Sequence, residues 1–226
     1  MSAALIVMAR YPTPGQVKTR LARTLGAINA CVLYQAFLHD LDARLAARAE
    51  QVVWAFDPPN CDFAALVSTR ARCVPQEGDD LGARMRRSFE TVHAAGFYPL
   101  IMIGADCPHL RDEWIDEAWD ALARTDIVLG PSEDGGYYLI GMRQPRDLFT
   151  AIRMGTPTVC RETLDRIATL NLSVHLLPPT FDVDEGPDVR RLQQLIAAGD
   201  VRSLMPETAR VLSRISLCHA RPIRRD

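Results

Sequence analysis

The chain has 226 residues, a formal net charge of −2 and 24% charged residues. This length suits one globular domain, and the near-neutral, interspersed charge argues against nucleic acid as the main partner. No apolar stretch reaches the roughly twenty residues of a membrane span, and the apolar N-terminus is too short for a signal peptide, so we expect a cytoplasmic protein.

Apolar runs and segments of helical periodicity alternate along the chain, which predicts a doubly wound α/β fold with helices on both faces of a sheet. We expect one domain over residues 1–226, with residues 199–226 as a C-terminal helical extension and tail. Ligands of such sheets bind at the carboxyl ends of strands. Strands are predicted at 3–9, 51–56, 71–75, 98–104, 126–130, 136–142 and 173–177, and helices at 19–49 with a break near Gly26, 81–95, 114–122, 156–170, 187–198 and 207–217.

The loop after the first predicted strand contains the only lysine of the chain, Lys18, together with Gly15 and Arg20. A glycine lets the backbone approach a ligand, and the free N–H groups of a helix that begins here attract anions, as the two cations do. The loop is therefore a candidate diphosphate site. The alternative is a simple strand-to-helix connector with a solvated lysine and arginine.

A carboxylate, Asp106, follows the strand predicted to end at Gly104. Mg²⁺ takes one or two protein carboxylates together with phosphate oxygens and water, so Asp106 is a candidate ligand of Mg²⁺ or Mn²⁺. The metal would neutralise charge on a leaving diphosphate. A turn or helix-capping aspartate is the alternative.

Two more carboxylates, Asp182 and Asp184, follow the last predicted strand. They alternate, so on an extended chain they face the same way, and either could complete the metal site. Acidic residues also favour helix starts, and we expect Asp188 to be structural.

Two further segments follow predicted strands. Asp134, Gly135 and Gly136 are typical of a hairpin turn, but the glycines could also leave the backbone bare for a substrate, with Asp134 binding a hydroxyl or the acceptor. Gln76 could read a nucleobase edge with its paired donor and acceptor, whereas Asp79 or Asp80 is expected to cap the next helix.

Together these motifs resemble the GT-A nucleotide-diphospho-sugar transferase superfamily, and within it a bacterial glycosyltransferase family, some members of which carry the label arsenosugar-biosynthesis glycosyltransferase. The chain is more distantly similar to 2-phospho-lactate guanylyltransferase and molybdenum-cofactor nucleotidyltransferases, although its first loop lacks their Gly-Gly-x-Gly-x-Arg form. The matching stretches, in order, are Pro12-x-Pro14-Gly15-x-Val17-Lys18-Thr19-Arg20-Leu21, Asp80-Leu81-Gly82-x-Arg84-Met85, Gly104-x-Asp106-Cys107-Pro108, Gly130-Pro131-x-x-Asp134-Gly135-Gly136-Tyr137-Tyr138-Leu139-Ile140-Gly141 and Asp182-Val183-Asp184.

The resemblance implies a single GT-A domain with a mostly parallel mixed sheet, and it implies roles for individual residues. Asp106 and Asp184 would bind the metal, and Lys18, Asp106 and Asp134 would be catalytic. Substrate would contact Asp134, Gly135 and Gly136. The nucleotide and its phosphates would be bound by Ala9, Arg10, Gly15, Lys18, Arg20, Gln76 and Gly82.

The sequence departs from the family pattern at two places that bear on the acceptor. Ala83 stands where relatives often carry Glu, and Met154-Gly155-Thr156 replaces a Trp-Ser-Thr-like run.

These features predict a glycosyltransferase that uses Mg²⁺ or Mn²⁺, a nucleotide-diphospho-sugar donor and a small-molecule acceptor. The alternatives are a nucleotidyltransferase that acts on a nucleoside triphosphate with release of pyrophosphate, and a non-catalytic nucleotide-binding module. The sequence does not specify the base, the sugar, the acceptor or the oligomeric state.

Overall fold

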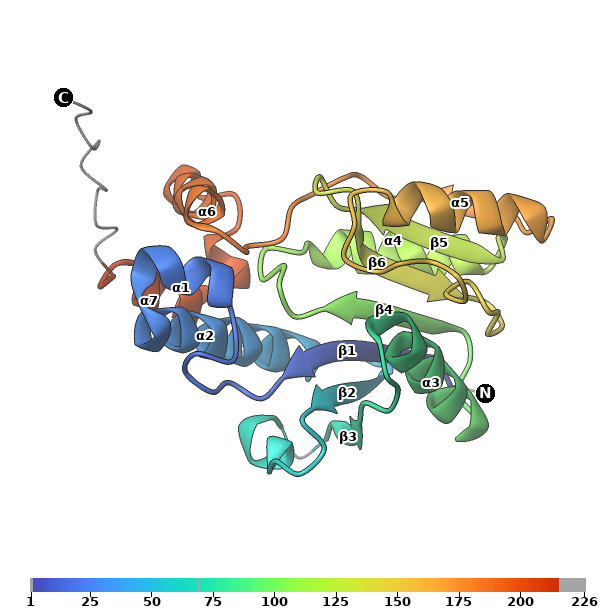
Figure 1. The fold of residues 1–226 in the computed structure, drawn as a ribbon, viewed down its shortest axis with the longest axis horizontal. Helices are drawn as coiled ribbons and strands as arrows, with labels where there is room; N and C mark the ends of the chain where they lie inside the picture. Colours follow the sequence, from blue (N-terminus) through green and yellow to red (C-terminus); the bar gives the residue numbers. More distant parts are fainter. Residues whose placement is uncertain (1, 69, 216–226) are drawn as a thin grey trace.

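Seven strands form one mixed sheet in the computed structural model, which describes residues 2–68 and 70–215. The order across the sheet is β3-β2-β1-β4-β6-β5-β7. Among these strands β6 alone is antiparallel to its neighbours, so the other six run in one direction. In Figure 1 the arrows of β1 and β4 accordingly point toward α1, and that of β6 points away. The strands are β1 (Ala4–Arg10), β2 (Gln51–Asp57), β3 (Arg72–Pro75), β4 (Leu100–Gly104), β5 (Ile127–Pro131), β6 (Tyr137–Met142) and β7 (Val174–Leu176).

Helices cover both faces of the sheet, as the sequence predicted (Figure 1). One face packs against α1, α2, α4, α6 and α7, and the other against α3 and α5. The helices are α1 (Thr19–Leu25), α2 (Ala27–Leu45), α3 (Leu81–Ala94), α4 (Asp112–Leu122), α5 (Val159–Thr169), α6 (Gly186–Ala198) and α7 (Pro206–Leu212), with short 3₁₀ turns at Phe63–Leu66 and Arg202–Leu204.

The continuous apolar run of β1 follows from this layering. Leu5, Val7 and Ala9 join the core on one face of the sheet, while Ala4 and Ile6 join the core on the other. A strand that is buried on both faces has no need of polar residues at alternate positions. The sequence therefore identified β1 by the absence of alternation.

The segment at the C-terminus is fixed by one buried carboxylate. Asp40 of α2 accepts hydrogen bonds from the backbone N–H groups of Glu207 (2.9 Å) and Thr208 (2.7 Å) at the start of α7. This contact satisfies two of the donors that a helix N-terminus leaves free. The helix predicted at 207–217 begins one residue earlier and ends at Leu212, and residues 216–226 lie outside the described part.

One helix start was predicted wrongly. Thr156 was expected to cap the helix over 156–170, but α5 begins at Val159 with Thr158 at the N-cap. A tertiary contact lies at this start, because the N–H of Cys160 donates to the carbonyl of Gly135 (2.9 Å). The Thr156 hydroxyl is used in its own loop, where it donates to the carbonyl of Arg153 (3.2 Å). Other boundaries differ by a few residues. The break near Gly26 is confirmed, because α1 and α2 meet there.

None of the helices within residues 2–68 and 70–215 is long and apolar enough to cross a bilayer.

Candidate nucleotide and metal site

The loops that the sequence singled out meet at one edge of the sheet. β1 lies between β2 and β4, with Arg10 opposite Asp57 and Met8 opposite Gly104. Because β1, β4, β5 and β7 are mutually parallel in direction, the loops that follow them emerge at the same edge. The segment before α6 joins the loop after β4 directly, because the N–H of Val183 donates to the carbonyl of Asp106 (2.9 Å).

Lys18 lies at the centre of this edge. It is the N-cap residue of α1, has left-handed backbone angles (φ 48°, ψ 44°), and its side chain is only 4% exposed. Its Nζ is 2.6 Å from Oδ1 of Asp106 and 2.9 Å from Oδ1 of Asp184. The structure thus brings together three residues predicted separately, two of which are 166 positions apart.

Aromatic side chains of α2 enclose the lysine. Its Nζ is 5.9 Å from the ring centroids of both Tyr34 and Phe37, and the Tyr34 hydroxyl accepts from the backbone N–H of Arg10 (3.0 Å). Burial by itself disfavours the charged amine, but the charges and hydrogen bonds of Asp106 and Asp184 outweigh it, so the pKa of Lys18 is raised. Lys18 is therefore a fixed cation at this edge.

Asp182 and Asp184 lie on the same side of their segment, as their alternation predicted, because Val183 between them is fully buried in the core. Their environments differ. Asp184 is bonded to Lys18, whereas Asp182 is half-buried and accepts a hydrogen bond from Ser132 (3.4 Å). Burial, together with the charge of Asp106, raises the pKa of Asp182 to about 7.

Asp106 and Asp184 have the donor chemistry of a magnesium or manganese site. Each places an oxygen within 3 Å of one point, the Lys18 ammonium, and solvent reaches both side chains, which are 46% and 39% exposed. No group of three or more His, Cys, Asp or Glu side chains that could hold a metal occurs in the described residues. The pair therefore fits a cation whose other ligands are phosphate oxygens and water.

The Asp134 turn is the hairpin between β5 and β6. Oδ1 of Asp134 accepts from the N–H of Gly136 (3.0 Å), and Gly135 has a φ of +90°. A Cβ on Gly135 would lie 2.0 Å from the Pro157 carbonyl oxygen. Glycine at 135 is thus required by a contact within the protein. The charge of Asp134 is the smallest of the causes that raise the pKa of Asp182.

Gln76 has a bracing role in this arrangement. Its Nε2 donates to the carbonyls of Ala9 (3.1 Å) and Ala55 (2.8 Å), which ties the loop after β3 to β1 and β2. The predicted use of a paired donor and acceptor on a nucleobase would need these bonds to break, because both amide hydrogens are engaged. The Oε1 atom remains as an acceptor.

The remaining predicted residues surround the edge in different ways. Gly15 has a φ of +78° and open space where a Cβ would stand, while Arg20 is exposed on α1. Gly82 faces Met154, whose Cε would lie 3.4 Å from a Cβ there. Asp80 caps α3 as one alternative predicted, accepting from the N–H of Ala83 (2.8 Å).

Asp57 and Arg84 lie beside Arg10, and the sequence assigned a role to neither of them. Oδ2 of Asp57 is 3.3 Å from Nη2 of Arg10 and 3.3 Å from Nη1 of Arg84. Asp57 is the last residue of β2, and Asp106 likewise lies just after the end of β4. This position at the carboxyl end of a strand is the signal that could have identified Asp57. Arg84 lies in the matching stretch from Asp80 to Met85, but that stretch did not indicate which residue it contacts.

A family model described as an uncharacterized protein conserved in bacteria (DUF2064) matches residues 38–156, more than half of the chain. The chain belongs to this family. No curated protein matches the DUF2064 chain. The matched residues contain Asp106 and Asp134 but neither Lys18 nor Asp184.

Solved structures extend the likeness of the DUF2064 protein over the remainder of the chain. A protein provisionally named a nucleotide-diphospho-sugar transferase, from Desulfovibrio desulfuricans G20, is 30% identical and has a TM-score of 0.84, over 95% of this chain and 98% of that chain. This match confirms the predicted superfamily and fold.

Two other structures share the fold at low identity. CMP:2-keto-3-deoxy-manno-octonic acid synthetase complexed with CTP is 14% identical, with a TM-score of 0.55 over 88% of this chain and 100% of that one. Rv0371c from Mycobacterium tuberculosis H37Rv in complex with manganese is 18% identical, with a TM-score of 0.52 over 86% and 99%.

Proposed function

We propose that the DUF2064 protein is a transferase that moves a sugar from a nucleotide-diphospho-sugar to a small-molecule acceptor, with Mg²⁺ or Mn²⁺ bound at Asp106 and Asp184. The observation that carries the proposal is the convergence of Lys18 with these two carboxylates at the carboxyl edge of the sheet. Membership of the nucleotide-diphospho-sugar transferase superfamily supports a nucleotide-dependent transfer.

Lys18 would hold both the carboxylates and the donor. An ammonium group has three N–H donors, and Asp106 and Asp184 account for two of them. The third is left for a phosphate oxygen, and the raised pKa keeps the group charged throughout the neutral range. Arg10 and Arg20, which flank the same loop, would share the charge of the diphosphate.

The local charge suits a divalent cation. One ammonium faces the carboxyl groups of Asp106, Asp182 and Asp184, so negative charge exceeds positive charge at this point. When bound, Mg²⁺ or Mn²⁺ would supply the charge that stabilises the departing diphosphate. The manganese complex of Rv0371c, which shares the fold, supports this choice. Asp134, in the turn between β5 and β6, is the candidate contact to the acceptor.

Nucleotidyl transfer from a triphosphate is the second candidate. The synthetase that shares the fold was solved with CTP. In the DUF2064 protein, Lys18, Asp106 and Asp184 would bind the phosphates and metal of a triphosphate as they would those of a diphosphate. A binding module without turnover is the third candidate, motivated by Ala83 and by Gly155 at the predicted acceptor side.

Calorimetry with UDP, GDP, CDP, ADP, their sugars and their triphosphates, with and without Mn²⁺, tests the proposal. We expect metal-dependent binding of one diphosphate, lost in Asp106→Asn and retained in Asp120→Asn, an exposed residue of α4 with the same change in charge. Product analysis then separates the candidates. A nucleoside diphosphate product supports glycosyl transfer, pyrophosphate supports nucleotidyl transfer, and binding without any turnover supports the module. Metal-independent binding, or none, would contradict the site.

A further inference from the structure

Two arginines converge on one carboxylate next to the proposed phosphate loop. Asp57 is the last residue of β2 and pairs in register with Arg10 of β1. Its side chain is 13% exposed, and its Oδ2 contacts both Arg10 and Arg84 at 3.3 Å. Both guanidinium groups thus contact the same carboxylate oxygen, and solvent reaches both arginine side chains, which are 61% and 33% exposed.

Each guanidinium is also tied to a loop at the same edge of the sheet. Nε of Arg84 donates to the carbonyl of Gly78 (3.1 Å), in the loop after β3. Nη1 of Arg10 donates to the carbonyl of Gln16 (3.4 Å), in the loop after β1. These contacts use some of the five N–H donors of each arginine. In the described part of the chain the Nη2 group of Arg84 has no protein acceptor, so it is left for a ligand.

The two halves of the edge have opposite charge. Arg10, Asp57 and Arg84 together carry one net positive charge, whereas at Lys18 the carboxyl groups outnumber the single ammonium. β2 and β4 are the two neighbours of β1, so these centres are about two strand spacings apart, on the order of 10 Å. One half attracts a cation and the other an anion, as a metal-bound nucleotide diphosphate would require.

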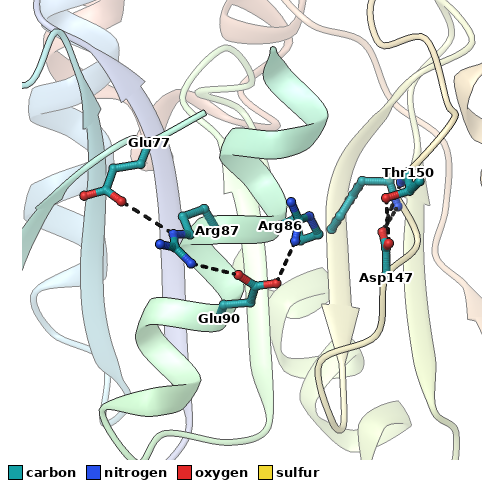
Figure 2. A network of polar contacts seen from close by, with 7 residues as sticks. Glu77, Arg86, Arg87, Glu90, Asp147 and Thr150 are labelled. Carbon is teal, nitrogen blue, oxygen red and sulfur yellow. Dashed lines mark hydrogen bonds and ion pairs between the residues drawn. The ribbon is translucent and has the colours of Figure 1, made fainter. Parts of the chain in front are cut away.

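The other arginines of α3 are engaged elsewhere. Figure 2 shows Arg87 between Glu77 and Glu90, and Arg86 bonded to Glu90 as well. The distances are 3.1 Å for Arg86 and 3.5 Å for each contact of Arg87, whose side chain is 58% exposed. Acidic partners match the charge of these two arginines on the outer surface, while Arg84, one turn before Arg87, is directed to the sheet edge.

We propose that Arg84 binds the phosphate chain of the nucleotide together with Arg10, and that Asp57 is the residue that positions both guanidinium groups. A guanidinium can bond two phosphate oxygens at once, and a second one fixed beside it adds charge without additional ordering. This inference rests on the proposed function and extends its phosphate site to the end of β2 and the first turn of α3.

Calorimetric titration with inorganic pyrophosphate and with the preferred nucleoside diphosphate tests the assignment, using Arg84→Gln, Arg84→Lys, Asp57→Asn and the control Arg87→Gln. We expect Arg84→Gln to weaken both affinities about tenfold or more, because a charge-assisted hydrogen bond is lost. Arg84→Lys should fall between Arg84→Gln and the wild type, because lysine keeps the charge without the fork. Arg87→Gln should stay within about twofold of the wild type, since its charge is matched on the surface.

Asp57→Asn is the most informative variant, because a purely electrostatic role and a positioning role of Asp57 predict opposite changes in phosphate affinity. Removal of a negative charge beside a phosphate should tighten binding if Asp57 acts only through its field. If Asp57 holds the two arginines in place, binding should weaken. Weaker binding in both Asp57→Asn and Arg84→Gln, with Arg87→Gln unchanged, supports the proposal.

Two results would overturn it. Equal affinities for Arg84→Gln and Arg87→Gln would remove Arg84 from the site, and tighter binding by Asp57→Asn would remove the positioning role. If nucleotide binding is lost in Asp106→Asn but unchanged in Arg84→Gln, the inference alone fails. If the wild-type protein binds no nucleotide, the proposed function fails with it. Far-ultraviolet circular dichroism verifies that each variant is folded, and Arg84→Lys serves if Arg84→Gln is not.

Discussion

Replacement of Lys18 by Met should lower the free energy of unfolding by about 1 to 3 kcal/mol in metal-free buffer at pH 7. Removal of one partner from a fully buried ion pair costs about 3 to 5 kcal/mol, and an exposed pair is worth about 0 to 1 kcal/mol. Lys18 itself is buried, but solvent reaches Asp106 and Asp184 and screens the repulsion that remains between them. The expected loss therefore lies between these limits.

The pH dependence of this loss identifies its origin. The folded pKa of Lys18 is raised above the model-compound value of 10.5. A raised lysine pKa means that the stabilisation is complete below the unfolded pKa and is lost as the pH rises through the folded pKa. The difference between wild type and Lys18→Met should therefore be constant near neutral pH and shrink above about pH 10.5.

Urea denaturation of the wild type, Lys18→Met and the control Arg23→Met, an exposed residue of α1, measures the loss. Because Lys18 is the only lysine, incorporation of ¹³Cε-lysine gives one side-chain resonance, and its titration reports the pKa directly. Asp184→Asn should lower that pKa. The ion pairs of Lys18 with Asp106 and Asp184 would be refuted by two results together: a destabilisation below about 0.5 kcal/mol, equal to that of Arg23→Met, and a lysine resonance that titrates below pH 10.5.

Three further predictions concern the support of the site. Burial and the charge of Arg191 lower the pKa of His109 to about 4. The free energy of unfolding should therefore fall by up to about 3 kcal/mol as the pH drops from 6.5 to about 4, because only the unfolded chain gains the proton in this range. In urea denaturation, His109→Gln should reduce this dependence on pH. Asp40→Ala should cost about 2 to 4 kcal/mol, measured by urea denaturation, since two N–H groups of α7 lose their acceptor; a cost near zero would show that water replaces it. Gly135→Ala should lower the free energy of unfolding by at least about 3 kcal/mol, against about 1 to 2 kcal/mol for Gly15→Ala, measured by urea denaturation. Both residues have positive φ, but only at position 135 would the new methyl group meet a carbonyl.

The sequence by itself determined the layered α/β fold, because its pattern is local. A strand buried on both faces reads as an unbroken apolar run, as in β1, and an amphipathic helix repeats its apolar residues, as in α3. The sequence also indicated Lys18, Asp106 and Asp184 as candidates. Lys18 and Asp184 each precede a helix, and Asp106 follows a strand. In a doubly wound fold the carboxyl ends of parallel strands lie at one edge of the sheet, which is where ligands bind.

Only the tertiary structure decided which of these side chains meet and what each one bonds. Lys18 and Asp184 are separated by 166 positions. Gln76 follows β3, but its side chain donates to carbonyls of β1 and β2. The matching stretch includes Arg84 and not Arg87, but it does not indicate that Arg84 contacts Asp57 while Arg87 contacts Glu77. Propensity and periodicity act over a few residues, whereas hydrogen-bond partners are chosen by packing between segments distant along the chain, and that choice is not encoded in any local pattern.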